Sequence, residues 1–91
     1  MLEIKRAKDR FYIGESIIDD VARITWEDRG ENVIAITHTF VAPELRGQAI
    51  AGKLLNEVVV MARAENIKII PVCSYAVKKM TRNDEYADVL L

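Results

Sequence analysis

The feature that most constrains this chain is a strand–helix–strand succession in its second half. A β-branched, apolar run, Asn32–Val41, ends just before Pro43, which cannot donate a ladder hydrogen bond. An amphipathic pattern follows from about Gln48 to Asn66, with apolar residues at steps of three and four. A short apolar run, Ile67–Val72, comes next. This order predicts a parallel pair of strands joined by a right-handed helical crossover.

The segments before this unit have the pattern of antiparallel strands. Phe11–Gly14 is a short strand candidate, and Glu15–Asp20 turns the chain, although its Ile17-Ile18 pair is unusual for a turn. Val21–Glu27 alternates as a half-buried strand does, and a turn at Asp28–Glu31 follows it. The apolar positions of the alternating strand share one face: Ala22, Ile24 and Trp26.

The run Asn32–Val41 is apolar on both faces, as expected for a strand in the centre of a sheet. Strict alternation puts Ile34, Ile36, His38 and Phe40 on one face and Val33, Ala35 and Val41 on the other. After the last strand, we expect Ser74 to cap a short helix from Tyr75 to about Arg82. The predicted fold is therefore α+β, with a mixed sheet and the order β-β-β-α-β-α.

Length and composition narrow the class of protein. The chain of 91 residues is long enough for one domain, residues 1–91, with 51% hydrophobic and 30% charged residues. A net charge of -1 gives no field that favours nucleic acid or an anionic membrane. The single cysteine, Cys73, excludes an internal disulfide and fits a reducing compartment. The longest apolar run, Val58–Ala62, falls far short of the ~20 residues of a membrane span. We expect a cytoplasmic monomer or homodimer, with no nucleic-acid or membrane partner.

The junction of the central strand and the long helix is Arg46-Gly47-Gln48-Ala49-Ile50-Ala51. Where a strand leads into a helix, the first helical turn leaves unpaired N–H groups and the positive end of the helix dipole in one place. Such a junction is a ready site for phosphate. We therefore expect an anion to bind here.

A second interpretation of the same segment is a nucleotide-binding P-loop. Gly47 to Lys53 has the spacing G-x-x-x-x-G-K. The next residue is Leu54, however, where a P-loop uses Ser or Thr to hold magnesium. Ile50 and Ala51 also share the phase of the helix that follows, so the helix should begin earlier than in a P-loop. The P-loop is the less favoured alternative.

The segment Arg46–Ala51 resembles the acyl-CoA loop Q/R-x-x-G-x-G/A of the GNAT N-acetyltransferase superfamily. Arg46 and Ala51 match it, and Ala49 stands in place of the middle glycine. The likeness runs from about Arg10 to Leu90 and is greatest to small stand-alone GNAT-like proteins. Three blocks carry it: Thr37-His38-Thr39, Pro43-Glu44-Leu45-Arg46-Gly47-Gln48 and Pro71-Val72-Cys73-Ser74-Tyr75-Ala76.

The resemblance implies a minimal GNAT fold that uses acetyl-CoA as acyl donor and no metal. In that superfamily the strands on either side of the helix splay apart, and pantetheine enters the wedge. Carried over, the pantetheine would meet Phe40 and Val41, and the pyrophosphate would lie on Arg46, Gly47, Gln48, Ala49, Ile50 and Ala51. Cys73 would lie near the thioester.

The resemblance also implies an activity, transfer of acetyl to a primary amine that the sequence does not identify. The chain lacks the leading helices and final hairpin that build the acceptor site in longer members. A non-catalytic acyl-CoA-binding or regulatory module is therefore the alternative.

Three side chains are candidates for catalysis. His38, the only histidine, could take a proton from the amine, or could be a hydrogen-bonded core residue. Cys73 precedes a predicted helix, whose dipole favours thiolate, and could carry the acetyl group or merely line the slot. Tyr75 could protonate the departing CoA thiolate, a role of tyrosines in the superfamily, or could pack its ring. One histidine and one cysteine are too few for a metal site.

Overall fold

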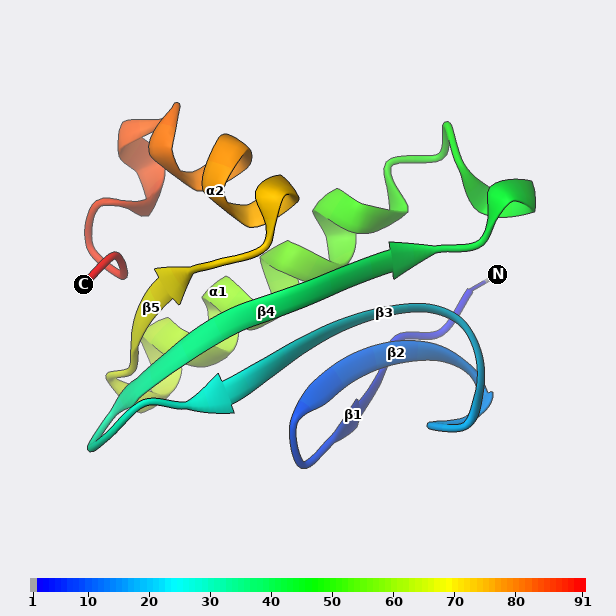
Figure 1. The fold of residues 1–91 in the computed structure, drawn as a ribbon, viewed down its shortest axis with the longest axis horizontal. Helices are drawn as coiled ribbons and strands as arrows, with labels where there is room; N and C mark the ends of the chain where they lie inside the picture. The colour runs from blue at the N-terminus through cyan, green and yellow to red at the C-terminus, as the bar shows by residue number, and fades with distance from the viewer. Residues whose placement is uncertain (1) are drawn as a thin grey trace.

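The computed structural model describes residues 2–91, which form a five-stranded sheet with α1 behind it in the view of Figure 1. The strands lie in sequence order, β1 to β5. Neighbours are antiparallel from β1 to β4, and the β4–β5 pair is parallel. The elements are β1 Lys5–Ala7, β2 Arg10–Ser16, β3 Asp19–Asp28, β4 Val33–Val41, η1 Pro43–Leu45, α1 Ile50–Glu65, β5 Lys68–Pro71, α2 Ser74–Thr81 and η2 Asp84–Tyr86.

The predicted mixed α+β fold is confirmed, including the parallel pair on either side of the long helix. The strand β1 was not predicted, because three residues with two charges have no apolar alternation. Pairing with β2 alone makes it a strand. The turn between β2 and β3 is Ile17-Ile18, and Ile18 is almost fully exposed.

The core lies between α1 and the sheet. Leu54, Leu55, Val58 and Val59 come from the buried stripe of α1, at the predicted spacing of three and four. The sheet supplies Ile24 from β3 together with other fully buried side chains, Ile36 and Ile69 among them. Each buried aliphatic side chain contributes about 1.5–3 kcal/mol of transfer free energy. The pairing of apolar stripe and central strands therefore fixes how α1 lies on the sheet.

The central strand β4 contains a β-bulge that changes its faces. Thr25 of β3 pairs with His38, whereas Trp26 pairs with Ile36, so Thr37 is an extra residue in β4. Directly paired side chains share a face. His38 and Phe40 therefore lie opposite to Ile36, on the face away from α1. The prediction that these residues share one face with Ile34 and Ile36 was wrong, because the bulge breaks the alternation.

Both helices begin at residues other than those predicted. α1 starts at Ile50 rather than Gln48, and Ala49 at its N-cap has left-handed backbone angles of φ 59° and ψ 28°. α2 starts at Ser74, so Ser74 is not the cap. Cys73 is the N-cap instead, and its sulfur accepts a hydrogen bond from the Ala76 N–H.

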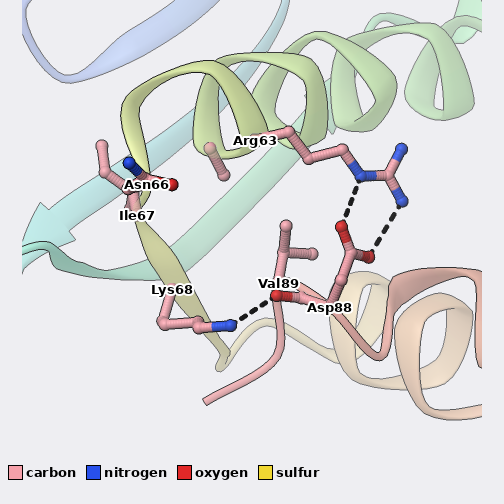
Figure 2. Close-up of a pocket in the computed structure, with 7 residues that line it drawn as sticks. Arg63, Asn66, Ile67, Lys68, Asp88 and Val89 are labelled. Atoms are coloured by element: carbon pink, nitrogen blue, oxygen red, sulfur yellow. Dashed lines mark hydrogen bonds and ion pairs between the residues drawn. The ribbon is translucent and has the colours of Figure 1, made fainter.

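The C-terminal segment is held against the end of α1 and the edge of β5. Leu90 forms a parallel bridge with Ile69. Figure 2 shows the Arg63 guanidinium reaching across a cavity to both carboxylate oxygens of Asp88. The Lys68 ammonium donates to the Asp88 carbonyl in the same place. These bonds bring the end of the chain back to the sheet. No helix among residues 2–91 has the length and apolarity to cross a membrane.

Candidate functional site

The β4–β5 pair opens into a wedge halfway along β4. The ladder ends where Ile36 pairs with Pro71, although β4 continues to Val41. The N–H groups of Val72 and Cys73 both donate to the Ile36 carbonyl, at 3.0 Å each, and the chain then turns into α2. Within residues 2–91, β4 beyond Ile36 pairs only with β3. One edge of residues 37–41 is thus free to pair with an extended ligand.

Beyond the wedge, the chain forms a loop whose amide groups lack protein acceptors. In the described part of the chain, the N–H groups of residues 47–52 donate to no other group of the protein. Gly47 has φ +85°, and Ala49 provides no side-chain cap for α1. The Arg46 Nε donates to the Val41 carbonyl at 3.2 Å, which ties the loop to the end of β4.

The loop also forms one wall of a cavity of about 200 Å³. It is lined by Val41, Leu45, Arg46, Gly47, Ala49, Ile50 and Ala51. They include five of the six residues of the predicted loop, together with Val41 of β4 and Leu45 of η1, whereas Gln48 lines a different cavity. Free N–H donors, the positive end of α1 and the open strand edge fit a pyrophosphate joined to an amide-containing arm. The residues present are thus suited to the CoA that the sequence led us to expect.

The same geometry contradicts a P-loop. Gly52 and Lys53 lie inside α1, and the Lys53 N–H already donates to the Ala49 carbonyl at 3.2 Å. Leu54, where a P-loop needs a magnesium-binding hydroxyl, has no exposed surface and packs in the core. Ala49, which stands in place of the family's middle glycine, has left-handed backbone, the conformation that glycine adopts most easily.

Cys73 lies where the wedge opens. Its Sγ is 3.4 Å from the Thr39 hydroxyl. Thr39 lies on the face of β4 that α1 covers. The second contact of the sulfur is the Ala76 N–H, also at 3.4 Å. The thiol is half-buried between these two groups. The sequence predicted no separate role for Thr39, although three polar residues in succession, Thr37, His38 and Thr39, interrupt an apolar strand and indicate polar neighbours there.

Tyr75 connects the start of α2 with the start of α1. Its hydroxyl lies 3.7 Å from the point that a β-carbon on Gly52 would occupy. Burial raises the pKa of the Tyr75 phenol, and the nearness of two other acidic groups, the Tyr86 hydroxyl and the Cys73 thiol, raises it further. The phenol therefore keeps its proton at neutral pH, as a proton donor must.

His38 is separated from Cys73 by the sheet. The histidine is exposed on the open face, whereas Thr39 and the cysteine beside it lie on the helix-covered face. Phe40 is also on the open face, where the Arg23 guanidinium lies 4.7 Å from its ring centre. Only the backbone of Phe40 can therefore face the wedge. No group of three or more His, Cys, Asp or Glu side chains in residues 2–91 could hold a metal ion.

The sequence pattern of GCN5-related N-acetyl-transferases matches residues 10–89. The chain belongs to this family. A solved structure of a GCN5-like protein from Staphylococcus aureus, named as an N-acetyltransferase, is 44% identical to it. The match covers 99% of this chain and 88% of that one, with a TM-score of 0.83. Among curated proteins, none matches the chain.

Longer GNAT proteins share the fold over part of their length. An acetyltransferase of the GNAT family from Staphylococcus aureus Mu50 has a TM-score of 0.59 at 19% identity. The match covers 86% of this chain and 50% of that one. For an acetyltransferase from Clostridium acetobutylicum, solved with acetyl-CoA, the TM-score is 0.54 at 25% identity. There the match covers 77% of this chain and 54% of that one. The chain thus spans about half the length of these two proteins.

Proposed function

We propose that this GNAT protein binds acetyl-CoA in the wedge between β4 and β5 and transfers the acetyl group to a primary amine. The observation that carries the proposal is the continuity of the free β4 edge with the uncapped start of α1. An extended arm can pair with residues 37–41, and a pyrophosphate can accept bonds from the amides that follow. The Clostridium acetobutylicum protein, which shares the fold and was solved with acetyl-CoA, supports the choice of ligand.

Bound acetyl-CoA would supply the activated acetyl group as a thioester. We assign His38 to take a proton from the amine, directly or through water, because its exposed imidazole can meet an acceptor that approaches the open face. Tyr75 would give its proton to the departing sulfur. Cys73, next to the wedge, would line the slot for the thioester, with formation of an acetyl-cysteine as a slow side reaction.

A non-catalytic acyl-CoA-binding module is the second candidate. The position of His38 favours this second candidate. Its imidazole lies on the sheet face that α1 does not cover, and Cys73 lies on the other face. Without elements over that face, an acceptor amine has little to hold it. An acceptor that is itself a protein, or a second copy of the chain, would remove this objection.

The first experiment is a thermal-shift comparison of acetyl-CoA, CoA and Mg-ATP. A ligand at 100 times its Kd stabilises the folded state by about 2.7 kcal/mol. We expect both CoA compounds to raise the melting temperature and Mg-ATP to leave it unchanged. Stabilisation by Mg-ATP alone would refute the proposal.

Turnover is then measured as release of free CoA thiol in the presence of amines of four kinds. These are a polyamine, an amino sugar, a lysine peptide and a peptide with a free N-terminus. Release that depends on the amine and falls in His38→Ala supports the enzyme. Binding without release for any amine supports the module.

A further inference from the structure

The turn between β2 and β3 exposes two large apolar side chains that the turn itself does not need. Ile17 and Ile18 alone connect the paired residues Ser16 and Asp19. Turns of two residues favour glycine, asparagine and aspartate. Ile18 is nevertheless 93% exposed and Ile17 48%. The Ile18 N–H donates to the Ser16 hydroxyl at 3.3 Å, so the turn is stabilised through its backbone and not through the isoleucine side chains.

Two carboxylates flank this turn. Glu15 lies near the end of β2, Asp19 begins β3, and both are exposed. None of the ion pairs found in residues 2–91 includes Glu15 or Asp19. We call these four residues, Glu15, Ile17, Ile18 and Asp19, the hairpin tip. The surface that fits the hairpin tip is an apolar cavity with a cation beside it.

One cavity of the same chain has these properties. Its volume is about 370 Å³, and it is lined by Leu2, Ile4, Ile13, Gln48, Ile50 and Lys53. Four of these residues are apolar, and Leu2 is 43% exposed, so part of the apolar lining is in contact with water. Lys53 is the charged residue among them. Its ammonium is in none of the ion pairs that the described part of the chain forms.

The hairpin tip and the cavity lie at the same end of the molecule. Ile13, which lines the cavity, precedes Ile17 by four residues, or about 13 Å of extended chain. Figure 1 shows the β2–β3 turn and the N-terminus at one end of the long axis. Ile18 stays exposed in the single chain, so its own cavity does not bury it. A group of apolar side chains exposed in this way marks a surface that contacts another protein.

We propose that this end of the molecule is the interface of a homodimer, in which the hairpin tip of each copy enters the cavity of the other. A twofold axis makes the two contacts identical, so the assembly closes as a dimer. The contact removes the isoleucines from water and brings Glu15 and Asp19 close to the Lys53 ammonium across the interface. The charges that lack partners within one chain are thereby paired.

The interface also includes part of the loop at residues 46–51. Gln48 and Ile50 line the cavity that receives the hairpin tip. Each copy therefore contacts the start of α1 in the other copy. The inference does not depend on what the loop binds, because the apolar and charged groups of the interface belong to the protein alone.

Sedimentation equilibrium of the full chain without ligand tests this interface. We expect a reversible monomer–dimer equilibrium with a dissociation constant in the micromolar range, since a contact of this kind is small. Ile18→Ser should weaken the dimer by roughly a hundredfold. Each buried isoleucine side chain contributes about tenfold or more, and each dimer contains the change twice. Circular dichroism should show an unchanged fold, because Ile18 is not part of the core.

Val60→Ser is the matched control. Val60 is also an exposed apolar residue, but it lies on α1 and lines neither the cavity nor the hairpin tip. This variant should dimerise as the wild type does. Charge reversal adds a readout that loss of apolar surface cannot give. Lys53→Glu and Asp19→Lys should each weaken the dimer, and the variant with both changes should recover affinity.

Four results would overturn the proposal. The first is a wild-type chain that stays monomeric at every concentration. The second is a dimer that Ile18→Ser leaves intact or that Val60→Ser disrupts equally, because the interface would then lie elsewhere. The third is a double charge variant no tighter than the single ones. The fourth is assembly that continues beyond the dimer, since the reciprocal contact closes.

Discussion

Replacing Ala49 by glycine should stabilise the protein, although the same change inside a helix destabilises. Ala49 has φ 59° and ψ 28°. An L-residue in this left-handed region costs about 1–2 kcal/mol. Glycine removes that cost but loses about 0.5–1 kcal/mol more backbone entropy on folding. The net gain lies between about 0 and 1.5 kcal/mol, with a central value of about 0.75 kcal/mol.

The gain can be measured as a shift of the melting temperature. Unfolding entropies of about 2.1 cal/mol/K per residue make 1 kcal/mol equal to about 5 °C for a chain of this length. We therefore expect Ala49→Gly to melt about 2–5 °C higher in differential scanning calorimetry. Its affinity for acetyl-CoA should be equal or higher, since the lost methyl lines the loop cavity.

Ala64→Gly is the control, because Ala64 is an exposed residue inside α1. Glycine there should lower stability by about 1 kcal/mol, or about 5 °C. If Ala49→Gly melts as low as Ala64→Gly, residue 49 has helical rather than left-handed backbone and the argument is wrong.

Three further predictions concern single side chains. Incubation with acetyl-CoA and no amine, followed by peptide mass mapping, should find slow acetylation at Cys73. The variant Cys73→Ala should still turn over. If this variant binds CoA but has lost turnover, the thiol is the nucleophile. If Tyr75 protonates the leaving thiolate, Tyr75→Phe should lower kcat by roughly a hundredfold with little change in CoA affinity; a change within about twofold would leave the ring a packing role only. Arg63 lowers the pKa of the Asp88 carboxyl below its ordinary 3.8. The ion pair therefore stabilises the fold above that pH and loses its effect as the pH falls through the lowered value. The free energy of unfolding of Asp88→Asn, measured in urea, should accordingly equal that of the wild type at pH 2 and be lower than that of the wild type at pH 7. A variant that is less stable than the wild type by the same amount at both pH values would contradict the assignment.

The strand–helix–strand unit could be predicted from the sequence because its signals are local. Pro43 ends β4, and the apolar stripe of α1 repeats at the helical period. These patterns record which face of each element is buried. The loop between them could be predicted too, since it must join the two ends.

What the sequence did not reveal depends on partners distant in the chain. The edge strand β1 has no pattern of its own and exists through pairing with β2. The left-handed Ala49 conflicts with the helix propensity of alanine, and closure of the loop overrides it. Cys73 caps α2 instead of Ser74 because two amides bonded to Ile36 fix where the chain leaves β5.

Because of the extra residue in β4, the two halves of this strand should tolerate different substitutions at their even-numbered positions. Up to Ile36, the even-numbered positions point into the core, so a scan of all substitutions should accept only apolar side chains there. After Thr37 the phase inverts, and His38 and Phe40 point outward, so the even positions should accept polar residues. Deleting Thr37 would restore strict alternation and leave the imidazole on the open face, because His38 would then follow Ile36 directly. As far as folding stability is concerned, the exposed side chains in the second half of this strand can therefore change more freely than the buried side chains in its first half.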